Sequence, residues 1–134
     1  MSAQMRSVTV GDSGVGPYGQ TAVARGHTWR IDEPSEMGGA DSGPEPFELL
    51  CAALGACTTI TVRMYAARKR WPLDRIAVTV TYEKPAETAR FTRAITFEGP
   101  LDDEQRRRLL AIADKCPVHL TLSKASEIVT TLAG

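Results

Sequence analysis

The sequence predicts an α+β domain in which antiparallel strands surround one long helix. Two segments, Ile76–Lys84 and Arg90–Glu98, alternate apolar and polar residues with the period of half-buried strands. Apolar residues between Phe47 and Arg70 recur instead at intervals of three and four, which is the period of a helix. Along the whole chain these patterns give the order βββ-α-ββ-α-β, which is typical of the α+β class.

The N-terminal third is expected to contain three short strands. Segments Ser7–Val10 and Gln20–Ala24 are strand candidates on either side of the glycine-rich "GDSGVGPYG", which suits a hairpin. The segment His27–Asp32 also alternates, and it predicts the third strand. Residues 33–46 are rich in Pro, Gly, Asp and Ser, so they predict a loop that leads into a helix. Loops of this length in compact domains are often functional.

The segment Phe47–Arg70 predicts one helix of about 24 residues, roughly 36 Å long. Pro46 suits a first helical turn, Arg68–Arg70 favour the C-terminal end of the helix dipole, and Pro72 stops the helix. The β-branched run Thr58–Val62 would also fit a strand. Because no turn signal separates this run from the alanine-rich part, we expect a single helix, buried in the middle of the fold.

The C-terminal half is expected to contain a hairpin, a helix, a helical turn and a strand. The two alternating segments form an antiparallel pair joined by the loop "PAETA". A second helix lies within Leu101–Lys115, where Asp102 is the N-cap and Gln105 completes a capping-box spacing. Pro117 is preorganised for a new short helical turn, whose N-cap would be Cys116. The segment Ser126–Leu132 predicts a final strand.

The composition indicates one cytoplasmic domain over residues 1–134. Hydrophobic residues make up 43% and charged residues 24% of the chain, which is ordinary for a globular protein. Sixteen basic residues balance sixteen acidic ones, so the charge excludes the field expected of a nucleic-acid binder or a polybasic membrane anchor. The longest uninterrupted apolar run, Leu49–Cys57, falls short of the roughly 20 residues that span a bilayer, and the N-terminus has no hydrophobic signal core. We therefore expect neither nucleic acid nor membrane as a partner.

The three cysteines allow a structural and a chemical interpretation. An odd number does not suit a secreted disulfide framework, and free cysteines are often inert core residues. Cys51 and Cys57 lie six positions apart, about 240° round a helix, so they point in different directions and do not readily bridge each other. At a helix N-cap, backbone N–H groups would lower the pKa of the Cys116 thiol and make it reactive.

A metal site is the third interpretation of the cysteines. Cys116 and His119 have a C-x-x-H spacing, which is half of a zinc motif. The other ligands would have to come from Cys51, Cys57 or His27, and the sequence has no second paired motif. We therefore expect no metal and no other cofactor.

Two blocks carry a resemblance to a known family. "GPEPFELLCAALGACTTITVRMYAARKRWPL" and "LDDEQRRRLLAIADKCPVHLTL" resemble the two signature regions of the OsmC and organic hydroperoxide resistance (OsmC/Ohr) superfamily, closest to its OsmC-like branch. The resemblance covers most of the chain from about Tyr18 onward. It implies the OsmC-like fold, with antiparallel sheets around a long central helix in an intertwined homodimer. It also implies a thiol peroxidase that acts on organic hydroperoxides in the stress response.

The same resemblance assigns roles to individual residues. Cys57 matches the peroxidatic cysteine and Cys116 the resolving cysteine, which an external dithiol would reset after each turnover. In the family, an arginine from the N-terminal strands, paired to a glutamate, activates the peroxidatic thiol. Arg25 is our candidate for that arginine, with Arg30 as the alternative. The family places the glutamate ten positions before the cysteine, where this chain has Phe47, so the candidate acid is Glu48, one residue later.

Two further residues are candidates for the substrate pocket. His119 fits either the site or a polar position in the short turn. Tyr65, with Trp71, fits either an apolar pocket for an organic peroxide or the core of a dimer. Cys51 fits core packing. The competing functional class is an OsmC-like module that binds a small apolar or acyl ligand, or serves dimerisation, without efficient peroxidase turnover; the absence of glutamate at Phe47 favours it.

Overall fold

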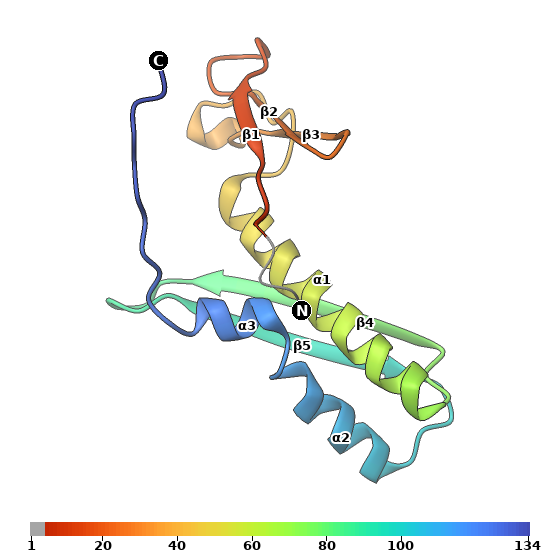
Figure 1. The fold of residues 1–134 in the computed structure, drawn as a ribbon. Coiled ribbons are helices and arrows are strands. Elements are labelled where there is room, and N and C mark those ends of the chain that lie inside the picture. The colour runs from red at the N-terminus through yellow and green to blue at the C-terminus, as the bar shows by residue number, and fades with distance from the viewer. Residues whose placement is uncertain (1–4) are drawn as a thin grey trace. The chain divides into compact units, whose positions relative to one another are not determined.

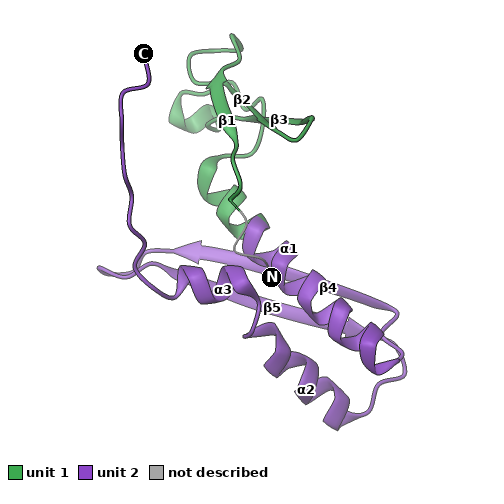
Figure 2. Ribbon diagram, in the orientation of Figure 1, with its two compact units in different colours: residues 1–52 green, residues 53–134 purple. Residues whose placement is uncertain are grey.

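The structure, a computed structural model, describes residues 5–134 and has the α+β class that the sequence predicts (Figure 1). In chain order its elements are β1 (Thr9–Asp12), β2 (Gln20–Ala24), β3 (His27–Ile31), the 3₁₀ turn η1 (Ser35–Met37), α1 (Pro46–Lys69), β4 (Arg75–Glu83), β5 (Arg90–Glu98), α2 (Asp103–Ala113) and α3 (Pro117–Leu122). The chain divides into two compact units, an N-terminal unit that ends at Ala52 and a C-terminal unit over Ala53–Gly134 (Figure 2). The division falls within α1, so the expectation of one domain over residues 1–134 stays a prediction.

The N-terminal unit contains a three-stranded antiparallel sheet in the order β1-β2-β3. Its first strand begins two residues later than the alternation indicates, because the register pairs Thr9 with Val23 and Asp12 with Gln20. A two-residue turn, Arg25-Gly26, joins β2 to β3, and both residues have positive φ, 51° and 85°. Positive φ at both positions matches the right-handed twist of the strands that such a turn connects.

The loop between β3 and α1 is held by the buried carboxylate of Asp32. One carboxylate oxygen accepts from the Glu33 amide at 2.7 Å, and the other accepts from the Ser42 amide at 3.1 Å and the Ser42 hydroxyl at 2.7 Å. The hydrogen bonds from Ser42 are the largest cause that lowers the pKa of this carboxyl group. Asp32 therefore fixes the end of the loop at Ser42 as long as it is ionised.

The C-terminal unit packs helices against one face of the β4–β5 hairpin. The two strands pair from Arg75 with Glu98 to Glu83 with Arg90, and exposed residues alternate with partly buried ones along both. The core residues come from α1, α2 and their flanking segments: Val62, Tyr65, Ala66, Leu73, Leu101, Leu109, Ile112 and Ala113, with Trp71, Ile76, Ile95 and Phe97 against them. Gly55 brings α1 close to the hairpin, since a Cβ there would lie 3.3 Å from Val80 Cγ2.

The long helix forms as expected, including its β-branched part, but it is not buried in the middle of the fold. Only 28% of its most apolar 18-residue window is buried, because the elements of the single chain cover one side of it. Thr58–Val62 is helical, and Thr58 satisfies its hydroxyl by donating to the Leu54 carbonyl oxygen at 2.7 Å. An 18-residue window of α1 has a mean hydropathy of 1.4, so length and composition alone would let it cross a membrane. The apolar part of α1 is therefore longer than the uninterrupted run Leu49–Cys57, on which the sequence-based expectation relied. The central helix of a soluble protein passes the same test, and the finding is weak evidence for a membrane.

Helix ends in the C-terminal unit follow the capping residues, but the last predicted strand is wrong. Asp102 accepts from the Gln105 amide at 2.7 Å, and Gln105 Oε1 accepts from the Asp102 amide at 2.9 Å, which confirms the capping box. The segment Ser126–Leu132 forms no strand, and Ile128 and Leu132 are 86% and 93% exposed. Alternation shows which face of a strand could be buried, but a strand also needs a hydrogen-bonding neighbour, and this segment has none within the described residues.

Arg70 ends α1 in a conformation that an arginine adopts at a cost. Its φ is 58°, the Trp71 amide donates to the Ala66 carbonyl at 2.9 Å, and the Arg70 amide donates to the Ala67 carbonyl at 3.1 Å. This is the Schellman pattern, in which the left-handed position is usually glycine.

We expect Arg70→Gly to stabilise the protein by about 0.5–1 kcal/mol. The left-handed conformation costs a non-glycine residue roughly 1–2 kcal/mol, and the greater freedom of glycine in the unfolded chain offsets part of that gain. Urea denaturation measures the change. The matched control is Arg68→Gly in the last helical turn, which should destabilise by about 1 kcal/mol; equal effects of both substitutions would contradict the prediction.

Candidate active site

Helices α1 and α3 of the C-terminal unit bring Cys57 and Cys116 together. Cys57 lies in the middle of α1 and is half-buried, whereas Cys116 is fully buried at the start of α3. As expected, Cys116 is the N-cap of the short helix that Pro117 begins. Its sulfur accepts from the His119 amide at 3.3 Å, and the sulfur of Cys57 lies 3.5 Å from the Val118 amide nitrogen. Two successive amides of α3 thus donate to the two sulfurs.

The surroundings of Cys57 act on its acidity in opposite directions. Burial is the largest cause, and it raises the pKa of the Cys57 thiol above the ordinary cysteine value. The Val118 amide opposes this rise in pKa, the adjoining Cys116 thiol adds to it, and a hydrogen bond from Thr61 also opposes it. The Cys57 thiolate therefore has two hydrogen-bond donors, but the net effect still favours the thiol.

Arg93 on β5 joins three helices beside the thiols. Its side chain is 12% exposed, and its Nη1 donates to the Thr58 hydroxyl at 3.1 Å and to the Ala113 carbonyl oxygen at 2.9 Å. Its Nη2 forms an ion pair with Asp114 at 2.9 Å. The buried Thr58 hydroxyl in turn lies 3.7 Å from the Cys116 sulfur. Arg93 is thus connected to Cys116 through one intervening hydroxyl.

The guanidinium of Arg93 also determines which ring nitrogen of His119 carries the proton. Arg93 Nη2 lies 2.7 Å from His119 Nδ1. A guanidinium has donors only, so Nδ1 is the acceptor and the ring proton is assigned to Nε2. His119 is therefore held in one neutral tautomer while its own amide donates to Cys116.

Sequence reasoning did not identify Arg93 or Thr58. Along β5 the inward positions hold Phe91, Arg93, Ile95 and Phe97, so an arginine occupies one place in an otherwise apolar stripe. A charged residue at an inward position of a strand needs buried partners, and that is the signal that could have identified it. Thr58 gave no such signal, because its neighbours in sequence are also apolar or β-branched.

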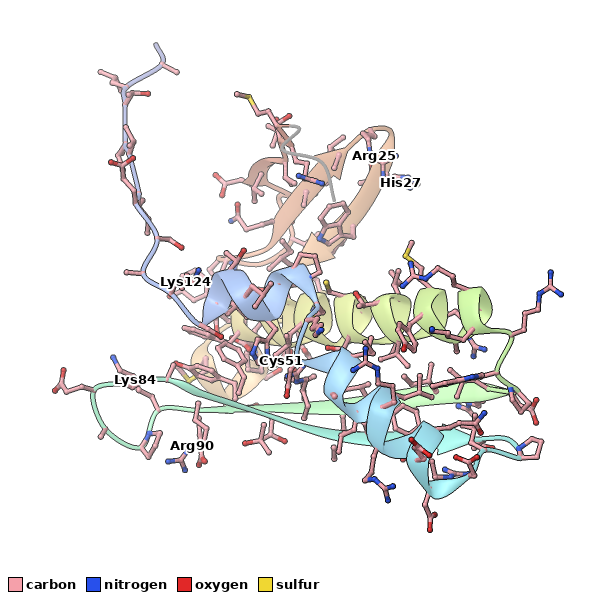
Figure 3. All side chains as sticks on the ribbon, turned by 60° about the horizontal axis from the view of Figure 1, so that its bottom comes forward. Arg25, His27, Cys51, Lys84, Arg90 and Lys124 are labelled. Atoms are coloured by element: carbon pink, nitrogen blue, oxygen red, sulfur yellow. The ribbon has the colours of Figure 1, made fainter. Side chains whose placement is uncertain are left out.

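The N-terminal unit holds the two residues proposed to activate Cys57. Arg25 is exposed in the turn between β2 and β3, at the tip of the hairpin that also carries His27 (Figure 3). Glu48 accepts from the Glu45 amide at 2.8 Å, and Glu45 accepts from the Glu48 amide at 2.7 Å, so both carboxylates cap the start of α1. Within the described part of this unit, no ion pair joins Glu48 to Arg25 or Arg30. An activating role for either residue stays a prediction.

The remaining candidates lie in separate surroundings. His119 lines a cavity of about 240 Å³ with Leu54, Phe91, Arg93 and Leu122. Neither cysteine lines this cavity, although Leu54 lies one helical turn before Cys57. Tyr65 lines a different cavity, formed by α1 and α2, which includes neither cysteine. Cys51 lies near the start of α1, where burial is the first cause that raises the pKa of its thiol.

The residues of this site do not form a metal centre. Within residues 5–134, no group of three or more His, Cys, Asp or Glu side chains could hold a metal ion. His119 Nδ1 is engaged by Arg93, which leaves the C-x-x-H pair without its imidazole nitrogen on that side. What the site offers instead is two adjacent thiols, two amide donors and one buried cation.

Comparison with known proteins shows the family to which this α+β chain belongs. The family model described as OsmC-like protein matches residues 39–131, and the chain belongs to the OsmC/Ohr superfamily. No match was found among curated protein sequences.

Several solved structures share the fold. An OsmC-like protein from Mycoplasma pneumoniae is 18% identical, with a TM-score of 0.77 and coverage of 91% of this chain and 89% of that one. The organic hydroperoxide resistance protein OhrB of Bacillus subtilis is 20% identical, with a TM-score of 0.64 and coverage of 90% and 91%. An organic hydroperoxide resistance protein OsmC from Legionella pneumophila is 19% identical, with a TM-score of 0.63 and coverage of 91% of each chain. At these identities the likeness concerns the fold.

Proposed function

We propose that this protein is a cysteine-dependent peroxidase that reduces organic hydroperoxides to alcohols. The observation that carries the proposal is that the sulfurs of Cys57 and Cys116 accept hydrogen bonds from two successive backbone amides of α3. Of the two cysteines, the half-buried Cys57 is the more accessible. Membership of the superfamily and the hydroperoxide-resistance proteins among its structural neighbours support the same role.

The chemistry needs two thiols and one external reductant. The Cys57 thiolate attacks the distal oxygen of R–O–O–H, the O–O bond breaks, and the alkoxide takes a proton and leaves as the alcohol. Cys57 is then a sulfenic acid, and Cys116 attacks its sulfur to form the disulfide and release water. An external dithiol reduces this disulfide and restores both thiols.

The geometry supports this order of events. Cys57 is the sulfur that a solvent-borne peroxide reaches first, while the fully buried Cys116 is positioned to react only with its neighbour. The cavity lined by Leu54, Phe91 and Leu122 offers apolar surface beside the site for an organic group. Because burial raises the pKa of Cys57, we infer that its reactivity increases with pH through and beyond the ordinary cysteine range.

A hydroperoxide-consumption assay with a dithiol reductant tests the proposal. Cumene hydroperoxide should be consumed, and peptide mass mapping after one equivalent should show a Cys57–Cys116 disulfide with Cys51 still reduced. If Cys57 remains a free thiol while the protein stays folded, the peroxidase proposal fails. A module that binds a small ligand would then be the better account.

We also propose that the protein works as a cytoplasmic homodimer. Ile60 and Met64 lie one helical turn apart on α1 and are 54% and 63% exposed, so the single chain leaves an apolar stripe uncovered. A second copy that covers this stripe would remove it from water. Sedimentation should give a dimer, and a stable folded monomer at micromolar concentration would contradict the proposal.

A further inference from the structure

A second cavity lies between the C-terminal end of α1 and the first two turns of α2. Its volume is about 610 Å³, within the range of small-ligand sites, and it is lined by Tyr65, Lys69, Trp71, Asp102, Glu104, Gln105, Arg107, Arg108 and Ala111. Tyr65 follows Cys57 by eight positions on α1, which is about 12 Å along the helix axis. We call this space the α1–α2 cavity. It is independent of the site proposed for peroxide chemistry.

Basic side chains gather around the ring of Tyr65 in this cavity. The charged groups of Arg68, Lys69 and Arg108 lie 5.6, 5.7 and 5.5 Å from the ring centroid. The ion pairs found among residues 5–134 join Arg75 to Glu98, Arg90 to Glu83 and Arg93 to Asp114, so none of these three cations is paired with a carboxylate. Like charges repel each other, and an anion between them would relieve that repulsion.

The two acidic residues of the lining offset only part of this charge. Asp102 is committed to the capping box, where its carboxylate accepts from the Gln105 amide. Glu104 is exposed in the first turn of α2 and forms no ion pair in the described chain. The lining contains three basic side chains, Lys69, Arg107 and Arg108, against two acidic ones, so its net charge is positive. Arg68 does not line the cavity but adds a further positive charge beside the Tyr65 ring.

The hydroxyl group of Tyr65 adds a hydrogen-bond donor to the positively charged side chains of this cavity. The side chain is 9% exposed, and its hydroxyl oxygen accepts from Arg108 Nε at 3.0 Å. No residue in the described part of the chain accepts the proton of this hydroxyl. The hydrogen bond from Arg108 is the first cause that lowers the pKa of Tyr65, and a more acidic phenol is a stronger donor.

We propose that the α1–α2 cavity binds a small organic anion. Its oxyanion accepts from the Tyr65 hydroxyl and the Arg108 guanidinium, and its apolar body packs against Trp71 and Ala111. The volume favours an organic anion over a bare inorganic one, since a single phosphate or sulfate would leave most of the cavity empty. Binding of the anion requires no peroxidase activity, so this proposal does not depend on the proposed peroxidase function.

Benzoate is the probe for this proposal, because it joins a carboxylate to a flat apolar ring. Titration followed by NMR should give saturable shifts of the Trp71 indole N–H and the Arg108 Nε–H. Benzyl alcohol, which keeps the ring without the charge, should not saturate. Phosphate that binds more tightly than benzoate would overturn the organic part of the proposal, and a linear response to benzoate would overturn the site.

Three substitutions test the contacts. Arg108→Met and Tyr65→Phe should each weaken benzoate binding by about tenfold, because each removes a hydrogen bond to a charged group. The matched control is Arg90→Met, which removes the same charge near the loop between β4 and β5 (Figure 3) and should leave binding unchanged. Equal losses in Arg108→Met and Arg90→Met, with binding by Tyr65→Phe unchanged, would show unspecific attraction to positive charge and overturn the proposal. Circular dichroism checks that Tyr65→Phe, a change in the core, leaves the protein folded.

Discussion

Replacing Cys57 by serine is expected to reduce hydroperoxide consumption to the background rate. A serine hydroxyl is not ionised at neutral pH and is a far poorer nucleophile towards the O–O bond. The donors from Val118 and Thr61 stabilise a thiolate and cannot compensate for its loss. The matched control is Cys51→Ser, which removes another thiol from the same helix and should leave the rate unchanged. A Cys57→Ser variant that keeps the wild-type rate would assign the chemistry to another group.

Replacing Cys116 should separate the two halves of the reaction. Cys116→Ser is expected to retain the first turnover, because Cys57 still meets the peroxide. Without a neighbouring thiol, Cys57 should then advance to sulfinic acid under excess peroxide. Rapid-quench measurement of alcohol release and mass mapping of Cys57 together detect this outcome. Continued turnover at the wild-type rate, with no sulfinic acid, would show that Cys116 is not the resolving thiol.

A large effect is also expected from Arg93→Met. This change removes the hydrogen bonds that join Thr58, the end of α2 and His119, so it should destabilise the fold by about 2–3 kcal/mol. It should also slow formation of the Cys57–Cys116 disulfide by about tenfold to a hundredfold, since the amides that position both sulfurs belong to the helix that Arg93 holds.

Two measurements distinguish an effect of Arg93 on the position of the two sulfurs from an effect on the stability of the fold. Disulfide formation induced by diamide measures the approach of the two sulfurs without any peroxide, and ¹⁵N NMR reports the tautomer of His119. Arg93→Lys should keep the positive charge but lose the two-nitrogen geometry of the guanidinium, so we expect an intermediate rate of disulfide formation. Arg90→Met on the same strand is the control and should change neither quantity. If Arg93→Met lowers the thermal midpoint but leaves the diamide rate and the tautomer unchanged, its role is structural only.

Local patterns identified most of the elements because local physics forms them. The alternation over Arg90–Glu98 predicts β5 with its observed bounds, and the capping box at Asp102 and Gln105 predicts the start of α2. Pro117 indicated the short helix and its N-cap in the same way. In each case a few neighbouring residues satisfy their own hydrogen bonds or bury one face. The strand expected at Ser126–Leu132 was wrong, because a strand also needs a neighbouring strand that is distant in sequence, and local alternation does not supply one.

The α+β class, the long helix and the two cysteines worth testing could be predicted from the amino-acid sequence, since periodicity, caps and signature spacing are properties of neighbouring residues. The surroundings of the two thiols, in contrast, depend on tertiary packing. It brought β5 under α1 and α3, so that Arg93 meets Thr58 and His119 across 35 and 26 positions of the chain. It likewise engaged Glu48 in a helix cap and placed Tyr65 in a cavity without cysteines. These contacts depend on how distant elements pack, and no local pattern in the chain encodes them.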